Sequence, residues 1–148
     1  MKRGPRKPQV GAPLHGQAIQ ADAAVQFETA QSLNPTFPTQ YMLARAYQET
    51  GQLDTAASYF EALIESHPAY HQAHFDLGKV YSQMGRQGEA FLHLGKFYYG
   101  KGDIKKATFQ LKKALDFDQD PQQREEAEAL LAEIEAADDK DAKKKKKE

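Results

Sequence analysis

Apolar residues recur at helical spacing through the middle of the chain, as in the stripe Ile104, Ala107, Leu111 and Leu115. The pattern predicts seven helices, at 18–33, 37–50, 53–66, 71–84, 88–100, 104–117 and 122–137. The breaks between them carry residues that end helices, namely Pro35, Gly51, Pro68, Gly85, Gly102 and Pro121. Connections of two to four residues make neighbouring helices antiparallel. The chain is therefore predicted to be all-α.

Three short stretches of the chain nearly repeat one another. They begin at Leu43, Leu77 and Leu94, and each ends in a tyrosine four residues later. The first two begin 34 residues apart and the last two 17 apart. A period of 34 with a half-period of 17 is typical of helix pairs stacked in a row, which is a solenoid. Such a chain acts through its surface and shape.

These residues resemble the tetratricopeptide repeat (TPR) family, whose unit has Leu-Gly, then Tyr, then Gly, and in its second helix Ala, an aromatic residue and a closing Pro. The segment 37–70 carries this pattern in seven residues: Leu43, Ala44, Tyr47, Gly51, Ala56, Phe60 and Pro68. The resemblance implies a right-handed α-solenoid over 17–137, which binds a peptide or partner protein in its concave groove. We expect the basic segment 1–16 and the lysine-rich tail 138–148 to be disordered.

The helix at 88–100 fits the repeat in two ways. Glu89 and Ala90 begin it like the second helix of the unit that starts at 71. Leu94, Gly95 and Tyr98 instead make it resemble the first helix of a new unit. The two interpretations differ in which helices line the concave face, and the sequence leaves both open.

Strict 34-residue spacing aligns two further series of residues. Tyr41, Phe75 and Phe109 form an aromatic series, and Arg45, Lys79 and Lys113 form a cationic one. Four residues apart on a helix, each aromatic residue faces its cation. We predict a peptide-binding groove lined by these two series together with Gln48, Ser82 and Lys106. The alternative is that Phe109 packs under the last helix and the cations are solvated.

Charge divides the chain into an acidic body and two basic ends. Residues 9–139 hold ten basic and nineteen acidic groups, whereas Lys143–Lys147 is an unbroken lysine run. Cysteine is absent, which excludes disulfides and thiolate metal sites. The apolar runs fall far short of the ~20 residues of a membrane helix, and no apolar segment follows the basic start, so we expect a cytoplasmic chain.

Catalytic motifs are missing from the sequence. It contains no HExxH, no glycine-rich phosphate loop and no nucleophile motif, so we expect no enzyme activity, catalytic residue, metal or cofactor. His67, His71 and His74 lie close together without a carboxylate among them. The expected partner is a protein or an acidic peptide, without dedicated nucleic-acid binding. Self-association through a terminal helix is a weaker possibility.

A second resemblance covers residues 71–134. The run from Gly85 to Ala90, followed by His93–Tyr99 and Gln110–Leu115, resembles the C-terminal TPR region of bacterial periplasmic zinc metallopeptidases. That resemblance implies a substrate-recruiting part that is inactive without its HExxH domain. It gives an alternative hypothesis, in which the chain is part of a longer exported protein that serves envelope protein quality control.

Overall fold

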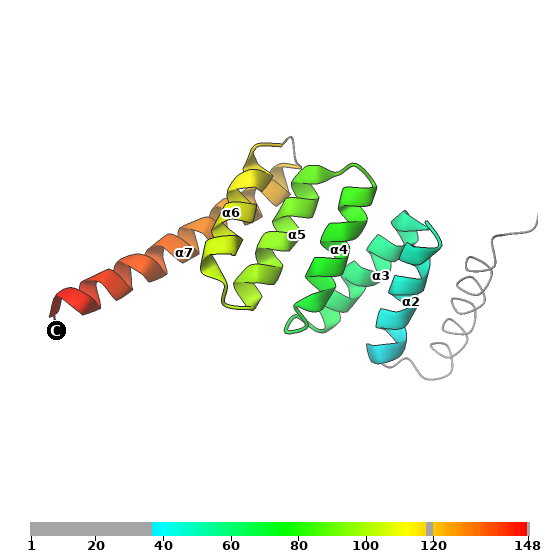
Figure 1. Cartoon of the computed structure of the whole chain (residues 1–148), viewed down its shortest axis with the longest axis horizontal. Coiled ribbons are helices and arrows are strands. Elements are labelled where there is room, and N and C mark those ends of the chain that lie inside the picture. Colours follow the sequence, from blue (N-terminus) through cyan, green and yellow to red (C-terminus); the bar gives the residue numbers. More distant parts are fainter. Residues whose placement is uncertain (1–36, 118–119, 148) are drawn as a thin grey trace, which may run out of the picture.

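Helices account for all the regular secondary structure in the residues described by the computed structural model, which are 37–117 and 120–147. There are six of them: α2 (Phe37–Glu49), α3 (Leu53–Ser66), α4 (Gln72–Gln83), α5 (Gln87–Gly100), α6 (Ile104–Leu115) and α7 (Pro121–Lys147) (Figure 1). The prediction of an all-α solenoid is confirmed. The predicted helix at 18–33 and the segment 1–16 lie outside the described residues. Within this part of the chain, no helix is long and apolar enough to cross a membrane.

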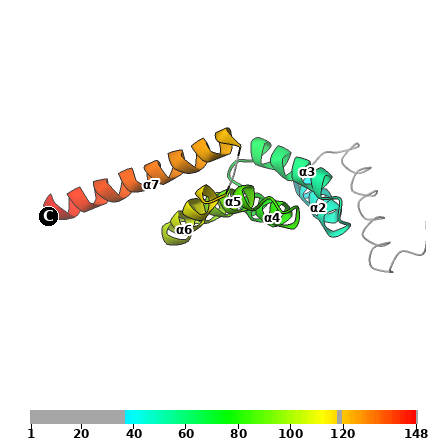
Figure 2. The same ribbon diagram turned by 90° about the horizontal axis from the view of Figure 1, so that it is seen from above.

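The helices form two layers. Figure 2 shows α4, α5 and α6 side by side, with α3 and α7 both on the same side of them. At one end α2 contacts both α3 and α4, and at the other end α5 contacts both α6 and α7. The described helices α4 and α6 belong to different ends, and none of their Cα atoms lie within 8 Å of each other. We call α2, α4, α5 and α6 the front layer.

Three of these helices end in the same turn. Gly51, Gly85 and Gly102 follow α2, α4 and α5, with φ angles of 80°, 81° and 81°. In each turn the amide after the glycine donates a 2.9 Å hydrogen bond to a tyrosine carbonyl, that of Tyr47, Tyr81 or Tyr98. Glycine adopts this left-handed conformation without steric cost, which is why it closes helices in this way. Because it ends in the same glycine turn as α2 and α4, α5 has the ending of the first helix of a repeat unit.

Close approaches between helices show that α5 has two roles. A Cβ atom added to Gly78 of α4 would lie 3.2 Å from the Leu94 side chain of α5. A Cβ added to the neighbouring Gly95 of α5 would lie 2.7 Å from Leu111 of α6. Through Leu94, α5 packs against α4 as the second helix of an α4–α5 pair. Through Gly95, it packs against α6 as the first helix of an α5–α6 pair. Both interpretations of this helix hold, each toward a different neighbour.

The buried core divides at α5 as well. One apolar cluster, which includes Leu43, Phe60 and Leu77, joins α2, α3, α4 and the start of α5. The other includes Leu92, Leu111 and Ile134 and joins α5, α6 and α7. Each fully buried side chain of this size contributes roughly 1.5–3 kcal/mol. The two halves of the molecule are thus stabilised by separate clusters that meet along one helix.

The C-terminal tail differs from the prediction. Helix α7 does not end at 137 but continues to Lys147, so the tail expected to be disordered over 138–148 is helical as far as this residue. The extension contains neither glycine nor proline, and Asp139 and Asp141 stand four residues before Lys143 and Lys145. Such pairs support an exposed helix, and lysines in the last turn favour its negative dipole end.

Candidate protein-binding face

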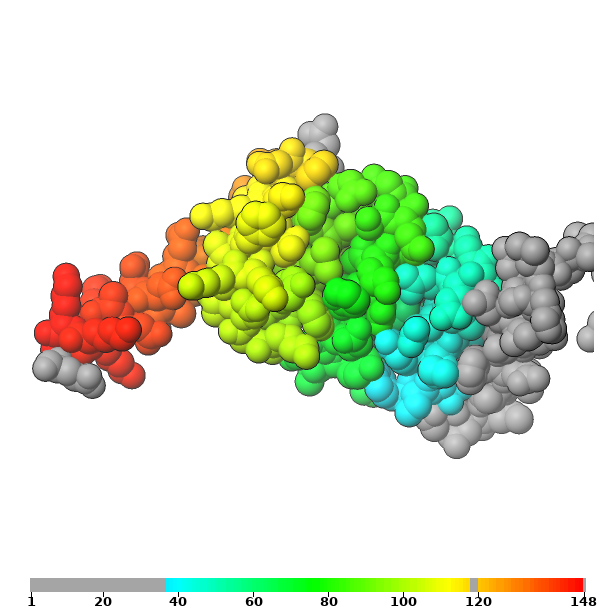
Figure 3. Space-filling model, in the orientation of Figure 1, coloured from blue at the N-terminus to red at the C-terminus, as the bar shows by residue number. Residues whose placement is uncertain are grey.

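Each helix of the front layer carries an aromatic residue with a cation four residues later. The cations lie over the rings at 6.0 Å for Arg45 and Tyr41, 5.5 Å for Lys79 and Phe75, 5.6 Å for Lys101 and Phe97, and 5.2 Å for Lys113 and Phe109. This spacing places both members on one face of a helix. Figure 3 shows this side of the molecule, with α6 side chains raised above the surface. We call it the front face.

Aromatic rings link two of these helices across the front face. Phe75 of α4 lies 5.1 Å from Phe97 of α5, and Phe97 lies 5.1 Å from Tyr98. Lys106 of α6 lies over the Tyr98 ring at 5.4 Å. The strict 34-residue spacing does not find Phe97 and Lys101, because neither stands 34 residues from a member of the two series. The signal that could have found them is the four-residue aromatic-to-cation spacing itself.

The most exposed aromatic residues lie at the α5–α6 end. Phe109 is 57% exposed and Phe117 is 40% exposed, which makes them two of the four exposed large apolar residues in the described chain. Phe117 stacks on Phe91 at 5.5 Å, and Lys113 lies 5.3 Å from Phe91 as well as over Phe109. Phe109 does not pack under α7, because α6 buries Leu111 and its other core residues toward that helix. An aromatic surface with lysine at its centre results.

At the α2–α4 end, two of the predicted groove residues have partners within the fold. The Tyr41 hydroxyl donates a 2.6 Å hydrogen bond to Asp76 Oδ2, and its ring meets the edges of Phe60 and Tyr70. Burial, followed by the hydrogen bond to Asp76, raises the pKa of Tyr41. Arg45 pairs with Glu49 at 3.6 Å. Tyr41 therefore joins α2 to α4 rather than standing free for a ligand.

The remaining predicted groove residues are spread over the front layer. Gln48 donates to Gln83 at 3.2 Å, which links α2 to α4. Ser82 is exposed on α4, and Lys106 lies 3.7 Å from Asp103 at the start of α6. Helix α5 separates the α2–α4 members of the predicted set from the α6 members. The 34-residue spacing that aligns Phe75 with Phe109 therefore does not make α4 and α6 neighbours.

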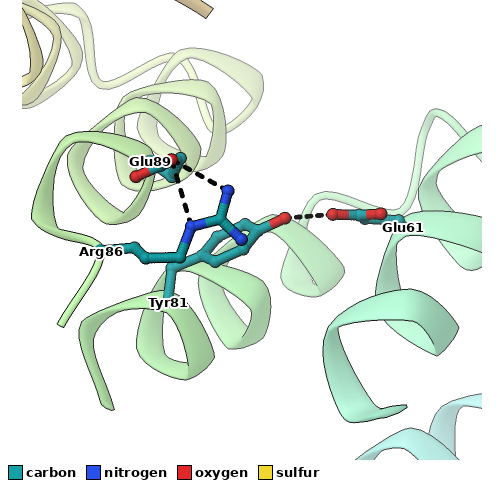
Figure 4. Close-up of polar contacts among 4 residues, drawn as sticks. All are labelled: Glu61, Tyr81, Arg86 and Glu89. Atoms are coloured by element: carbon teal, nitrogen blue, oxygen red, sulfur yellow. Dashed lines mark hydrogen bonds and ion pairs between the residues drawn. The ribbon is translucent and has the colours of Figure 1, made fainter. Parts of the chain in front are cut away.

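A polar network fastens the place where α5 begins. The Tyr81 hydroxyl of α4 donates to Glu61 of α3, and Arg86 donates from Nε at 3.2 Å and from Nη2 at 2.9 Å to Glu89 of α5 (Figure 4). The Arg86 guanidinium also lies 4.6 Å from the Tyr81 ring. Burial, together with the Glu61 carboxylate, raises the pKa of Tyr81. These contacts join three helices at the junction between the two apolar clusters.

Two histidines meet beside this network. The Nδ1 atoms of His74 and His93 lie 3.1 Å apart, so one ring donates its proton to the other. Burial and then nearby Lys96 lower the pKa of His74 to about 4, and burial lowers that of His93 well below its usual value. Both rings are therefore neutral at pH 7. Across the described helices and turns, no group of three or more metal-ligating side chains is assembled.

The geometry defines a helical repeat protein with a broad front face. Two stretches of the chain, 41–94 and 88–121, match the sequence pattern of the tetratricopeptide repeat, and together they span more than half of its 148 residues. The chain belongs to the TPR family. The second match covers α5 and α6 as one unit, and the two matches overlap at 88–94, in the first half of α5. The sequence pattern thus agrees with the double role of that helix.

No curated protein matches the chain. The resemblance to zinc metallopeptidases accordingly has no support from these comparisons.

Proposed function

We propose that this TPR protein is a non-catalytic interaction module that binds a partner protein on its front face. The observation that carries the proposal is Phe109, which is 57% exposed and has the Lys113 ammonium over its ring at 5.2 Å. Exposed aromatic residues grouped with Phe117 and Phe91 are the kind of surface that protein partners bury. Aromatic side chains in such patches dominate binding energy.

The charges of this face favour an acidic partner. Its aromatic residues alternate with Arg45, Lys79, Lys101, Lys106 and Lys113, and within the described helices Glu49 pairs with Arg45 and Asp103 with Lys106. Complementary charge increases the association rate and suppresses wrong partners more than it adds affinity. The partner of the front face is thus an acidic segment that also carries apolar side chains for Phe109 and Phe117.

Site-specific photo-crosslinking tests the proposal. A photoreactive phenylalanine analogue replaces Phe109 in one sample and Ser58, an exposed residue of α3 outside the front layer, in the control sample. After irradiation in cells, we expect a discrete adduct from position 109 and none of that mass from position 58. Lys113→Glu should remove the adduct because it reverses the charge at the centre of the patch.

Equal adducts from both positions, or an adduct that survives Lys113→Glu together with Lys106→Glu, would contradict the proposal. Lys79→Glu is a useful comparison, because it changes the same charge at the α4 part of the face. It should weaken the adduct less than Lys113→Glu, since Phe75 beneath Lys79 also packs against Phe97.

A further inference from the structure

The outward surface of α6 has a simple composition. Phe109 stands at its centre, Lys105 and Lys112 follow one edge, and Lys106 and Lys113 follow the other. All five side chains are exposed, and α6 contains no acidic residue. The two lysine pairs each stand seven residues apart, so each forms a row along the helix. We call this surface the α6 outer face.

The outward surface of α7 has the complementary composition. Ala129, Ala132 and Ala136 are exposed at its centre, on the side away from the buried Ala127 and Ile134. Two glutamate rows flank the alanines, with Glu128 and Glu135 on one edge and Glu126 and Glu133 on the other, again seven residues apart. The second row lies toward α5, where Glu126 pairs with Lys96 and Glu133 accepts from Tyr99. We call this surface the α7 outer face.

The two outer faces cannot meet within one molecule. Helices α6 and α7 pack against each other through Leu111, Ala114, Ala127 and Ile134, so their outer faces point in opposite directions. Figure 2 shows α6 and α7 on opposite sides of the molecule. Their complementarity is therefore available only between two copies.

We propose that the chain self-associates front to back, with the α6 outer face of one copy against the α7 outer face of a second copy. This inference rests on the front face of the proposed function and names a second copy as one of its partners. Phe109 lies over the alanines, which leave room for a ring, while lysine rows meet glutamate rows. The contact joins different surfaces, so each added copy exposes a new α6 and a new α7 outer face.

Charge sets the conditions under which this association is seen. Exposed ion pairs are individually weak and are screened by salt, so the association is weak and strongest at low ionic strength. Sedimentation velocity of the full chain over a concentration series measures it directly. We expect the average sedimentation coefficient to rise with concentration at low salt, and this rise to disappear at high salt.

Charge-reversal variants assign the contact to the two helices. Lys105→Glu with Lys112→Glu alters α6, and Glu128→Lys with Glu135→Lys alters α7. Each variant alone should sediment as a monomer at every concentration, because the reversed row then meets a row of the same charge and the remaining row is too weak to hold the contact. An equimolar mixture of the two should associate again, since each supplies the face that the other has lost.

A matched control separates this contact from the effect of net charge. Asp54→Lys with Glu65→Lys makes the same change of net charge as the α7 variant, on exposed positions of α3, and this variant should associate like the unaltered chain. A chain that stays monomeric at low salt overturns the inference, as does a control variant that loses association equally. If the partner adduct from position 109 persists in a monomeric chain, the inference alone fails and the proposed function stands.

Discussion

The double role of α5 makes a prediction about Gly95. Replacing it with alanine places a Cβ atom 2.7 Å from both Cγ and Cδ2 of Leu111, a fully buried side chain. Carbon atoms in contact lie about 3.5–4.0 Å apart, so the helices or the leucine must shift. Overpacking of this kind costs roughly 1–3 kcal/mol, whereas alanine gains about 1 kcal/mol over glycine as a helix former. Gly95→Ala should therefore lower the free energy of unfolding by up to about 2 kcal/mol.

Gly78→Ala is the matched control. Its added Cβ lies 3.2 Å from the Leu94 side chain and from the Ala90 carbonyl oxygen, a milder conflict that the helix-propensity gain should nearly offset. Urea unfolding followed by circular dichroism measures both variants. A double-mutant cycle sharpens the test, because Gly95→Ala should become stabilising in a Leu111→Ala background, where the conflict is gone. If Gly95→Ala costs no more stability than Gly78→Ala does, α5 does not pack on α6 as described.

Three further predictions concern the junction and the front face. The His74 pKa of about 4 lies below the ordinary 6.5, so the neutral ring stabilises the fold above pH 6.5 and this stabilisation is lost as the pH falls toward 4. Urea unfolding should show the free energy of unfolding falling by about 2 kcal/mol between pH 7 and pH 5. This fall should be much smaller in a His74→Gln, His93→Gln variant. Tyr81→Phe removes the bond from α4 to Glu61 of α3 and should cost ~1–2 kcal/mol, whereas Tyr99→Phe, at an exposed contact with Glu133, should change the melting temperature little. Phe109→Ala should leave the melting temperature nearly unchanged, while Leu77→Ala, at a fully buried residue, should cost ~2–5 kcal/mol; a large loss for Phe109→Ala would show that this ring is core.

The sequence was most informative where local chemistry decides the structure. Spaced tyrosines and glycines predicted the all-α solenoid, because each sets a turn or a close approach within its own helix pair. Two ambiguous residues, Leu94 and Gly95, carried the evidence for both roles of α5. Their adjacency could not show that both roles hold at once, since this depends on how α4 and α6 lie on either side of the helix.

The candidate site was less predictable for a physical reason. The 34-residue spacing assumes that every unit adds two helices, whereas α5 is shared between two units and separates α6 from α4. The sequence also does not show that Tyr41 has a partner within the fold, because its hydrogen-bond acceptor Asp76 lies 35 residues away on another helix. Phe97 and Lys101 were missed although their spacing matches that of the other pairs. The charge run at the end of α7 predicts disorder by composition, but its acid–base pairs four residues apart favour the helix that continues to Lys147.

Disulfide trapping tests the central claim, that α5 stands between α4 and α6 in one continuous front layer. The chain has no cysteine, so a single introduced pair reports without interference. Cysteines at Gly78 and Leu94 join α4 to α5 and should form a disulfide on oxidation, because a Cβ atom at position 78 would lie 3.2 Å from Leu94 Cγ. Phe75 and Gln110 stand 34 residues after Tyr41 and Asp76, and in a regular stack they would meet as that pair does. A disulfide needs Cα atoms within about 7 Å, and no Cα atoms of α4 and α6 lie within 8 Å of each other. We predict a disulfide for the first cysteine pair and none for the second, whereas a disulfide between positions 75 and 110 would contradict this arrangement.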